Sequence, residues 1–116
     1  MKRSAPLTRT TRLKAKGGRR FTHAHVDLGK IRWLHRQPCR CATRDAAHCW
    51  GVVEAHHEGE PGERDDRKTV PLCALGHHRE GPRSRHVLGS KGFERLHRVD
   101  LADEAARYEA AYQASR

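Results

Sequence analysis

The sequence predicts a small α+β domain that follows a basic N-terminal arm. Two short runs rich in strand-forming residues, 50–55 and 69–72, lie in the middle of the chain, and patterns typical of helices flank them. The length of 116 residues suits one domain. Only 35% of the residues are hydrophobic and 5% aromatic, so the core is expected to be thin and a bound metal would help to hold it. The scarce aromatics are expected in that core, namely Trp33, Trp50 and Phe93.

The N-terminal half is expected to contain one short helix. Apolar residues recur at helical spacing over 26–35. Pro38 ends the pattern, because a proline lacks the backbone N–H that a helix needs. Residues 39–49 show no hydrophobic periodicity, which indicates a knuckle or a loop.

The two expected strands form the centre of the domain. The first, 50–55, has the sequence Trp-Gly-Val-Val-Glu-Ala, and its two valines favour extended structure. His56 and His57 follow directly at its end. Residues 58–67 form a polar loop rich in turn residues, and the second strand, 69–72, follows this loop.

Two more helices are expected in the C-terminal half. One starts near His77, and the Gly-Pro pair at 81–82 breaks it. The other spans 96–112, where Asp100 can cap the helix and acidic residues in the first turn favour the helix dipole. Charges interrupt every long apolar run, so neither a membrane span nor a signal peptide is expected. The prediction is a soluble, cytoplasmic protein.

The positive charge is concentrated at the N-terminus. The net charge is +10, and residues 1–44 hold thirteen of the 24 Lys and Arg side chains but only one acid, Asp27. We expect residues 1–22 to form a flexible basic arm that binds DNA through its phosphates, and residues 23–116 to form the domain. The alternative is a basic tail without a binding function that only makes the protein more soluble. The arm's candidate DNA-binding residues are Arg12, Lys14, Lys16, Arg19 and Arg20.

The cysteines have the spacing of a structural zinc site. Cys41 and Cys49 flank a seven-residue loop, and Cys73 and His77 are four residues apart. In a reducing compartment, such cysteines bind metal more often than they form disulfides. Two pairs that meet across a hairpin would make a closed, tetrahedral Cys3His site for Zn²⁺. Cys39 can replace Cys41, or all four cysteines can bind and release His77; alternatively, the cysteines only fill apolar space.

Paired histidines follow both expected strands. His56 and His57 end the first, and His77 and His78 follow the second. Imidazole is a common metal ligand and a natural general base near neutral pH. Either pair alone is compatible with surface histidines, but the two pairs on one hairpin indicate a catalytic metal site.

The segment VEAHHEGEPGERDDRKTVPLCALGHHREGPRSRHVLGSKGFERLH, at residues 53–97, resembles the HNH endonucleases of the His-Me finger superfamily. The similarity covers about residues 31–112 and is greatest to the small phage and prophage type linked to recombination. The specific combination is His-His, then Pro-Leu-Cys about fifteen residues later, then a second His-His. The resemblance implies a ββα-metal core, in which a two-stranded hairpin and a helix hold one divalent cation, Mg²⁺ or another.

The resemblance also implies roles for individual residues. The histidine that ends the first strand of the family is the general base, so His57 or His56 takes this role and the other can bind the metal. His78 is the helix ligand. His86 occupies a His-Val-Leu-Gly position that can join the metal shell, although a solvated loop histidine fits the same pattern.

The chain departs from the common HNH pattern in two places. Where many relatives have an asparagine shortly before Leu-Cys, this chain has Arg-Lys-Thr at 67–69. Asp66 and Thr69 are therefore both candidates for the residue that orients the base. The gap of three residues at 74–76 is one residue longer than the usual spacing from the cysteine to the histidine pair, so the division of labour between His77 and His78 stays open.

These features predict a metal-dependent DNA endonuclease of low sequence specificity. Arg79, Arg83 and Arg85 lie near the second histidine pair and can hold flanking phosphates, or can merely keep a loop soluble. Two other functions fit the same residues. One is a zinc-stabilised DNA-binding accessory protein without catalysis, and the other is a protein-binding zinc module with an incidental basic tail.

Overall fold

The computed structural model describes residues 24–60 and 62–116. The basic arm predicted at 1–22, with its five candidate DNA-binding residues, lies outside the described residues. The secondary-structure elements run in the order β1 (Ala24–His25), α1 (Leu28–His35), α2 (Ala42–Asp45), η2 (Ala46–His48), β2 (Val53–His57), β3 (Arg64–Asp65), β4 (Thr69–Cys73), η3 (Ala74–His78), α3 (Arg85–His97) and α4 (Leu101–Ala114). The predicted α+β class is confirmed.

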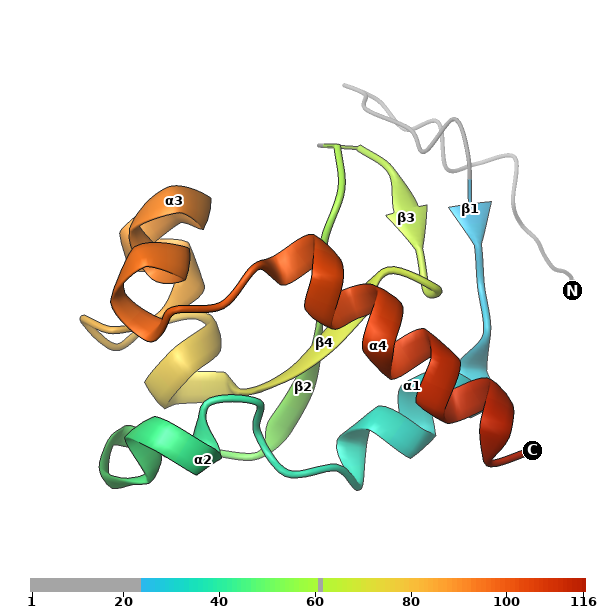
Figure 1. The fold of residues 1–116 in the computed structure, drawn as a ribbon, viewed down its shortest axis with the longest axis horizontal. Helices are drawn as coiled ribbons and strands as arrows, with labels where there is room; N and C mark the ends of the chain where they lie inside the picture. Colours follow the sequence, from blue (N-terminus) through green and yellow to red (C-terminus); the bar gives the residue numbers. More distant parts are fainter. Residues whose placement is uncertain (1–23, 61) are drawn as a thin grey trace, which may run out of the picture.

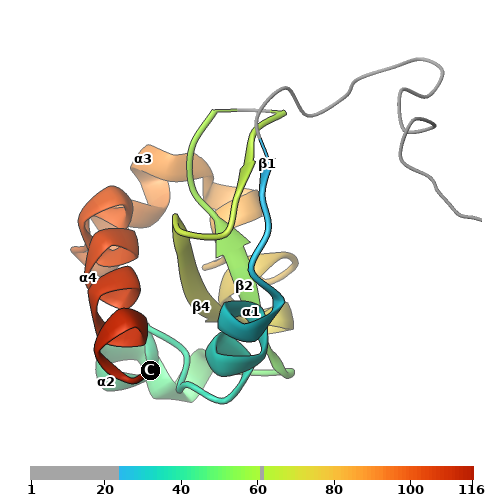
Figure 2. The ribbon, with the colours of Figure 1, turned by 90° about the vertical axis from the view of Figure 1, so that its right-hand side faces the viewer.

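An antiparallel hairpin of β2 and β4 forms the centre of the fold (Figure 1). Its register pairs His57 with Thr69 and Val53 with Cys73. Every residue of β4 is buried, because α4 packs against β4, and α1 contacts both strands (Figure 2). The turn η3 continues directly from β4, so the second histidine pair is carried by the end of the hairpin.

The core is small and includes the thiols. Apolar side chains of β4, α3 and α4 meet there with three buried cysteines. The members of the cluster are Cys39, Cys41, Val70, Leu72, Cys73, Phe93, Leu101 and Ala105. This composition agrees with the thin core expected from the sequence, in which cysteine takes positions that larger apolar residues fill in richer domains.

Two ion pairs attach α4 to the rest of the domain. The ammonium group of Lys30, which is almost completely buried, lies 2.9 Å from Glu109 of α4. The guanidinium group of Arg40 donates two hydrogen bonds to Glu104, at 2.8 and 3.1 Å. Since a buried charge is costly unless it is paired, these contacts define where α4 can lie.

The two predicted strands and the first and last predicted helices differ from the observed elements mainly at their ends, but the helix expected to start near His77 was wrong: the turn η3 ends at His78, and the next helix, α3, begins only at Arg85 and was not predicted. The second strand and the cap of the last helix are confirmed, and Asp100 accepts a hydrogen bond from the N–H of Asp103 at 3.0 Å. The first strand begins three residues later than predicted, so its two histidines lie within β2. Residues 96 and 97 belong to α3, which ends at Arg98 in the left-handed conformation (φ 57°).

One prediction about the chain's packing was wrong. Trp50, expected in the core, is 70% exposed, because β2 begins only at Val53 and Trp50 precedes the hairpin. Trp33 is half-buried against Tyr108 and Tyr112, and Phe93 is fully buried as expected. The predicted loop 58–67 contains β3, which pairs in parallel with β1.

Among the described residues, none of the helices combines the length and apolar character needed to cross a membrane.

Candidate metal centres

The turn η3 carries two buried histidines, His77 and His78, which point in different directions. The N–H of Arg79 donates to the carbonyl of Ala74 at 3.0 Å, five residues back, which is the hydrogen bond of a π-helical turn. A π-helical turn accommodates one residue more than an α-helical one, which explains the longer spacing between Cys73 and the histidine pair. Neighbouring residues on a helical turn project in different directions, so His77 and His78 contact different groups.

His77 faces three thiols. Its Nδ1 lies 3.2 Å from Sγ of Cys73 and 3.6 Å from Sγ of both Cys39 and Cys49. Zinc bond lengths of about 2.3 Å to sulfur and 2.0–2.1 Å to nitrogen give an N···S edge of about 3.6 Å in a tetrahedral site. The four donors, which we call the thiol cluster, lie within 4.8 Å of one another and could hold a metal such as zinc.

The fourth cysteine lies beside this cluster. The sequence favoured Cys41 in the four-residue set, but the structure brings Cys39 there and groups Cys41 with His77 and His97. A hydrogen bond between the two thiols lowers the pKa of Cys39 and raises the pKa of Cys41. Cys39 also faces Nδ1 of His77 at 3.6 Å, so it is the member of the pair that is placed to bind a metal as a thiolate.

Asp45 orients His77 from the side opposite the thiols. Its Oδ2 lies 2.8 Å from Nε2 of His77 and accepts a hydrogen bond of 2.8 Å from Arg83, while Oδ1 lies 2.7 Å from Nδ1 of His48. Burial raises the pKa of Asp45, but these three hydrogen bonds outweigh it and leave the pKa well below its usual range. The carboxylate thus directs the proton of His77 to Nε2 and leaves Nδ1 free to face the thiols.

A second group, the histidine cluster, consists of His56, His78 and His86, whose ring nitrogens lie within 4.8 Å of one another. The ring centroids are 5.3 Å apart for the first two and 4.8 Å for the last two. Burial lowers the pKa of His56 to about 3 and also lowers the pKa of His78. Both imidazoles are therefore neutral at pH 7, which is the state that can bind a cation.

Two carboxylates hold the buried members of the histidine cluster. Glu54 lies 2.8 Å from Nδ1 of His78, and Glu58 lies 3.0 Å from Nε2 of His56. Among the described residues, the other nitrogen of each ring makes no hydrogen bond. Glu54 stands two residues before His56 on β2 and shares its face, because side chains alternate along a strand. Glu54 was not among the predicted site residues, although its spacing of two residues from His56 was a signal in the sequence.

His57 points away from His56 and meets Asp66. Its Nε2 lies 2.7 Å from Oδ1 of Asp66, which is completely buried. The carboxylate also accepts two hydrogen bonds from Arg64, at 3.0 and 3.1 Å, and one from the N–H of Asp27 at 2.7 Å. Burial raises the pKa of Asp66, but these contacts offset it and hold the pKa below its usual value.

Thr69 plays a different part from Asp66. Both were candidates for orienting the strand-end histidine, and of the two only the carboxylate makes a hydrogen bond with the imidazole. The hydroxyl of Thr69 donates to the backbone carbonyl of Asp66 at 2.8 Å. It therefore secures the loop that carries the carboxylate.

The three predicted arginines near the clusters have different partners. Arg79 donates two hydrogen bonds of 3.0 Å to Glu54, and Arg83 donates to Asp45. The Nε of Arg85 is buried and has no hydrogen-bond partner among the described residues. Such a donor can bind an acceptor from outside the protein, since a buried donor without a partner costs about 1–3 kcal/mol.

The structure therefore divides the candidate ligands between the thiol cluster and the histidine cluster, with Cys41 beside the first, and it leaves His57 and Asp66 as a separate pair. The sequence offered no signal for Asp45, which lies in a segment without hydrophobic periodicity. Comparisons with family models, with curated proteins and with solved structures found no match to this chain.

Proposed function

We propose that this protein is a metal-dependent DNA endonuclease. The observation that carries the proposal is the contact of His57 with Asp66, because His57 lies on the same short strand as His56, which belongs to a cluster of three histidines. A nuclease needs a base that deprotonates water and a cation beside the scissile phosphate. In this proposal β2, β4 and η3 form a ββα-metal core of the HNH type.

The proposed general base is His57. Its Nε2 is engaged by Asp66, so its Nδ1 is available to accept a proton from water. Asp66 keeps the ring in one orientation and stabilises the imidazolium ion that forms, as the carboxylate does in other acid–base pairs. The side chain of His57 is one-third exposed, so water and substrate can reach it.

The proposed catalytic cation is held by His56, His78 and His86. Three imidazole ligands suit a borderline ion such as Zn²⁺ or Ni²⁺ better than Mg²⁺, which prefers oxygen ligands. When bound, the cation would supply stabilisation of the charge on the phosphate and on the leaving oxygen. Glu54 and Glu58 then orient two of the three ligands from the outer shell.

Substrate binding is assigned to phosphate contacts. Arg85 provides a buried donor without a partner among the described residues, and its charge is close enough to His56 to lower the pKa of that ring. A phosphate oxygen would satisfy this donor. Together with the basic arm at 1–22, such contacts give affinity without reading the base sequence. Residues 23–116 would then be the nuclease domain.

The thiol cluster is assigned a structural zinc ion. Its four donors are largely buried, so the coordination would be closed and no position would be open to substrate. The cluster joins residue 39, residue 49 and the end of β4, which belong to separate segments of a thin core. A zinc ion there would therefore stabilise the fold that positions the histidines.

Cleavage of supercoiled plasmid DNA tests the proposal. The wild type, His57→Ala and His56→Ala are compared with added Mg²⁺, Mn²⁺ or Ni²⁺, and His35→Ala is the control because His35 is exposed on α1, away from both clusters. Only the wild type and the control should cut, while all four proteins bind DNA. If none cuts with any ion and all bind equally, the protein is instead a zinc-stabilised DNA-binding accessory protein.

A further inference from the structure

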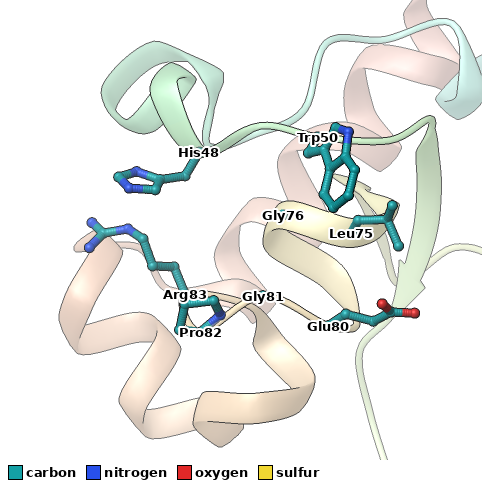
Figure 3. A pocket seen from close by; sticks show the side chains of 8 residues that line it. All are labelled: His48, Trp50, Leu75, Gly76, Glu80, Gly81, Pro82 and Arg83. Atoms are coloured by element: carbon teal, nitrogen blue, oxygen red, sulfur yellow. The ribbon is translucent and has the colours of Figure 1, made fainter.

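Trp50 lines a cavity that none of the proposed catalytic steps uses. The cavity has a volume of about 320 Å³ and lies between the residues that precede β2 and the segment that follows η3. Trp50 and Leu75 form one side, and His48 and Arg83 lie together on the other (Figure 3). We call it the Trp50 pocket.

The exposed indole is held by a fixed backbone. The carbonyl of Trp50 accepts hydrogen bonds from Leu75 and Gly76, at 3.0 and 3.1 Å, and its N–H donates to Sγ of Cys73 at 3.4 Å. A Cβ on Gly76 would come within 2.9 Å of the nitrogen of Trp50. The ring is thus presented to solvent from a backbone packed against η3, although a tryptophan would gain stability by burial.

The opposite side of the pocket carries the positive charge of Arg83, and hydrogen bonds fix its side chains. Asp45 accepts hydrogen bonds from Nε of Arg83 and from His48. Among the described residues, the terminal nitrogens of Arg83 make no hydrogen bond, and a third of its side chain is exposed. The guanidinium group is therefore oriented by one edge and free to bind an anion with the other.

We propose that the Trp50 pocket binds an unpaired nucleobase of DNA, which stacks on Trp50 while its phosphate contacts Arg83 and His48. An exposed aromatic ring beside an oriented arginine is the combination that binds single strands, because every base has a face that stacks. Paired bases cannot reach the ring, since both of their faces are covered by neighbours. The basic residues concentrated at 1–44 favour a polyanion over an apolar peptide as the partner of the chain, and Arg83 supplies a positive charge at the pocket itself.

The inference rests on the proposed function for its choice of DNA, and it adds a preference for DNA with an unpaired base. The carboxylate of Glu80 lines the same pocket and lies on the side away from Arg83 (Figure 3). It would repel a phosphate placed at that end. This charge arrangement gives the bound nucleotide one direction, with its phosphate at the cationic side.

Fluorescence of Trp50 tests the proposal directly. Trp33→Phe removes the chain's other tryptophan and keeps an aromatic ring against Tyr108 and Tyr112. His57→Ala is added so that the DNA is not cut, and the full chain is titrated with a ten-residue oligo-dT. The emission of Trp50 should be quenched on binding. An oligonucleotide of equal length and charge that carries abasic sites should bind more weakly and quench little.

Variants at the pocket separate stacking from charge. Trp50→Leu should weaken oligo-dT binding roughly 5- to 100-fold, as expected for the loss of one stacked base, whereas Trp50→Phe should keep much of the affinity. Val52→Ala is the matched control, because Val52 is also an exposed apolar side chain, at 73%, but does not line the pocket. The wild type and the three variants should all bind a blunt duplex with the same affinity.

The results distinguish this inference from the proposed function. Equal quenching by the intact and the abasic oligonucleotide, or equal affinity of Trp50→Leu and Val52→Ala, would overturn the pocket proposal even if the wild type cuts plasmid DNA. Conversely, the pocket proposal would be supported and the nuclease proposal refuted if the wild type never cuts plasmid DNA while the intact oligonucleotide quenches Trp50 and the abasic one does not.

Discussion

Nε2 of His57 lies 2.7 Å from Oδ1 of Asp66, and the same carboxylate accepts the backbone N–H of Asp27 at 2.7 Å. The strand-end histidine is thereby connected to the segment between β1 and α1, which lies about 30 residues earlier in the chain. Arg64 completes the arrangement with two hydrogen bonds. The orientation of His57 thus depends on the loop between the hairpin strands and on the N-terminal end of the domain together.

Asp66→Asn is expected to lower the rate of DNA cleavage by about 10²-fold or more. An amide that presents its NH2 group to Nε2 favours the wrong tautomer of His57, so the base loses its free nitrogen. Single-turnover cleavage at saturating metal measures the effect. Asp65→Asn is the matched control, because the carboxylate of Asp65 pairs with Arg67. Similar rates for the two variants would contradict the role of Asp66.

The four cysteines are expected to differ in zinc binding. Cys39→Ser, Cys49→Ser and Cys73→Ser should each lose a tightly held zinc ion, since each removes one corner of the thiol cluster. Cys41→Ser should retain the ion, because Cys41 lies outside that set of four donors. Zinc content per chain and the thermal unfolding midpoint report the outcome. Loss of zinc in Cys41→Ser, with retention in Cys39→Ser, would reverse the assignment.

Glu54→Gln is expected to weaken binding of the exchangeable cation by roughly 10- to 100-fold. The carboxylate lies 2.8 Å from Nδ1 of His78, and outer-shell partners of this kind contribute about that much to metal affinity. Titration with Ni²⁺ by calorimetry measures it. The zinc content should stay the same. Glu60→Gln, at an exposed position without a histidine partner, should bind Ni²⁺ like the wild type.

The stability of the metal-free protein is expected to fall as the pH drops from about 6.5 towards 3. Burial lowers the pKa of His56 to about 3 in the folded state, whereas the unfolded chain has a value near 6.5. The unfolded state therefore binds more protons in this window, and acid favours unfolding by up to about 4–5 kcal/mol from this group.

Urea unfolding at pH 7 and pH 5 measures the effect. His56→Gln cannot take up the proton, so its free energy of unfolding should change less between the two pH values than that of the wild type. His35→Gln serves as the control, because His35 is exposed. An equal pH dependence for the wild type and His56→Gln would show that the burial of His56 does not cause the acid sensitivity.

Deletion of residues 1–22 is expected to weaken DNA binding and to reduce its dependence on salt. The segment carries eight Lys and Arg side chains and no acid, and each phosphate contact adds close to one unit to the slope of log affinity against log salt concentration. Anisotropy with labelled duplex at several salt concentrations measures both. An unchanged slope would favour a protein-binding function, for which the basic tail is incidental.

The fold was predictable where the local pattern is unambiguous. The valine pair at the start of β2, the apolar run of β4 and the cap at Asp100 are local features, and the structure has an element at each. The error at Trp50 has a physical cause, since burial depends on where the hairpin begins and not on the side chain's hydrophobicity. The parallel pairing of β1 with β3 could not be predicted, because it involves two residues from each of two distant segments.

The sequence by itself determined which metal-binding side chains are available. It also determined that the two histidines of each adjacent pair point in different directions. His56 and His57 alternate across a strand, and His77 and His78 diverge on a helical turn, whatever surrounds them. Only the tertiary structure decided which member of each pair meets which partner. Asp66 and the thiols were among the candidates from the sequence, but which of them meets which histidine depends on packing between separate segments of the chain, and local sequence carries no information about that packing.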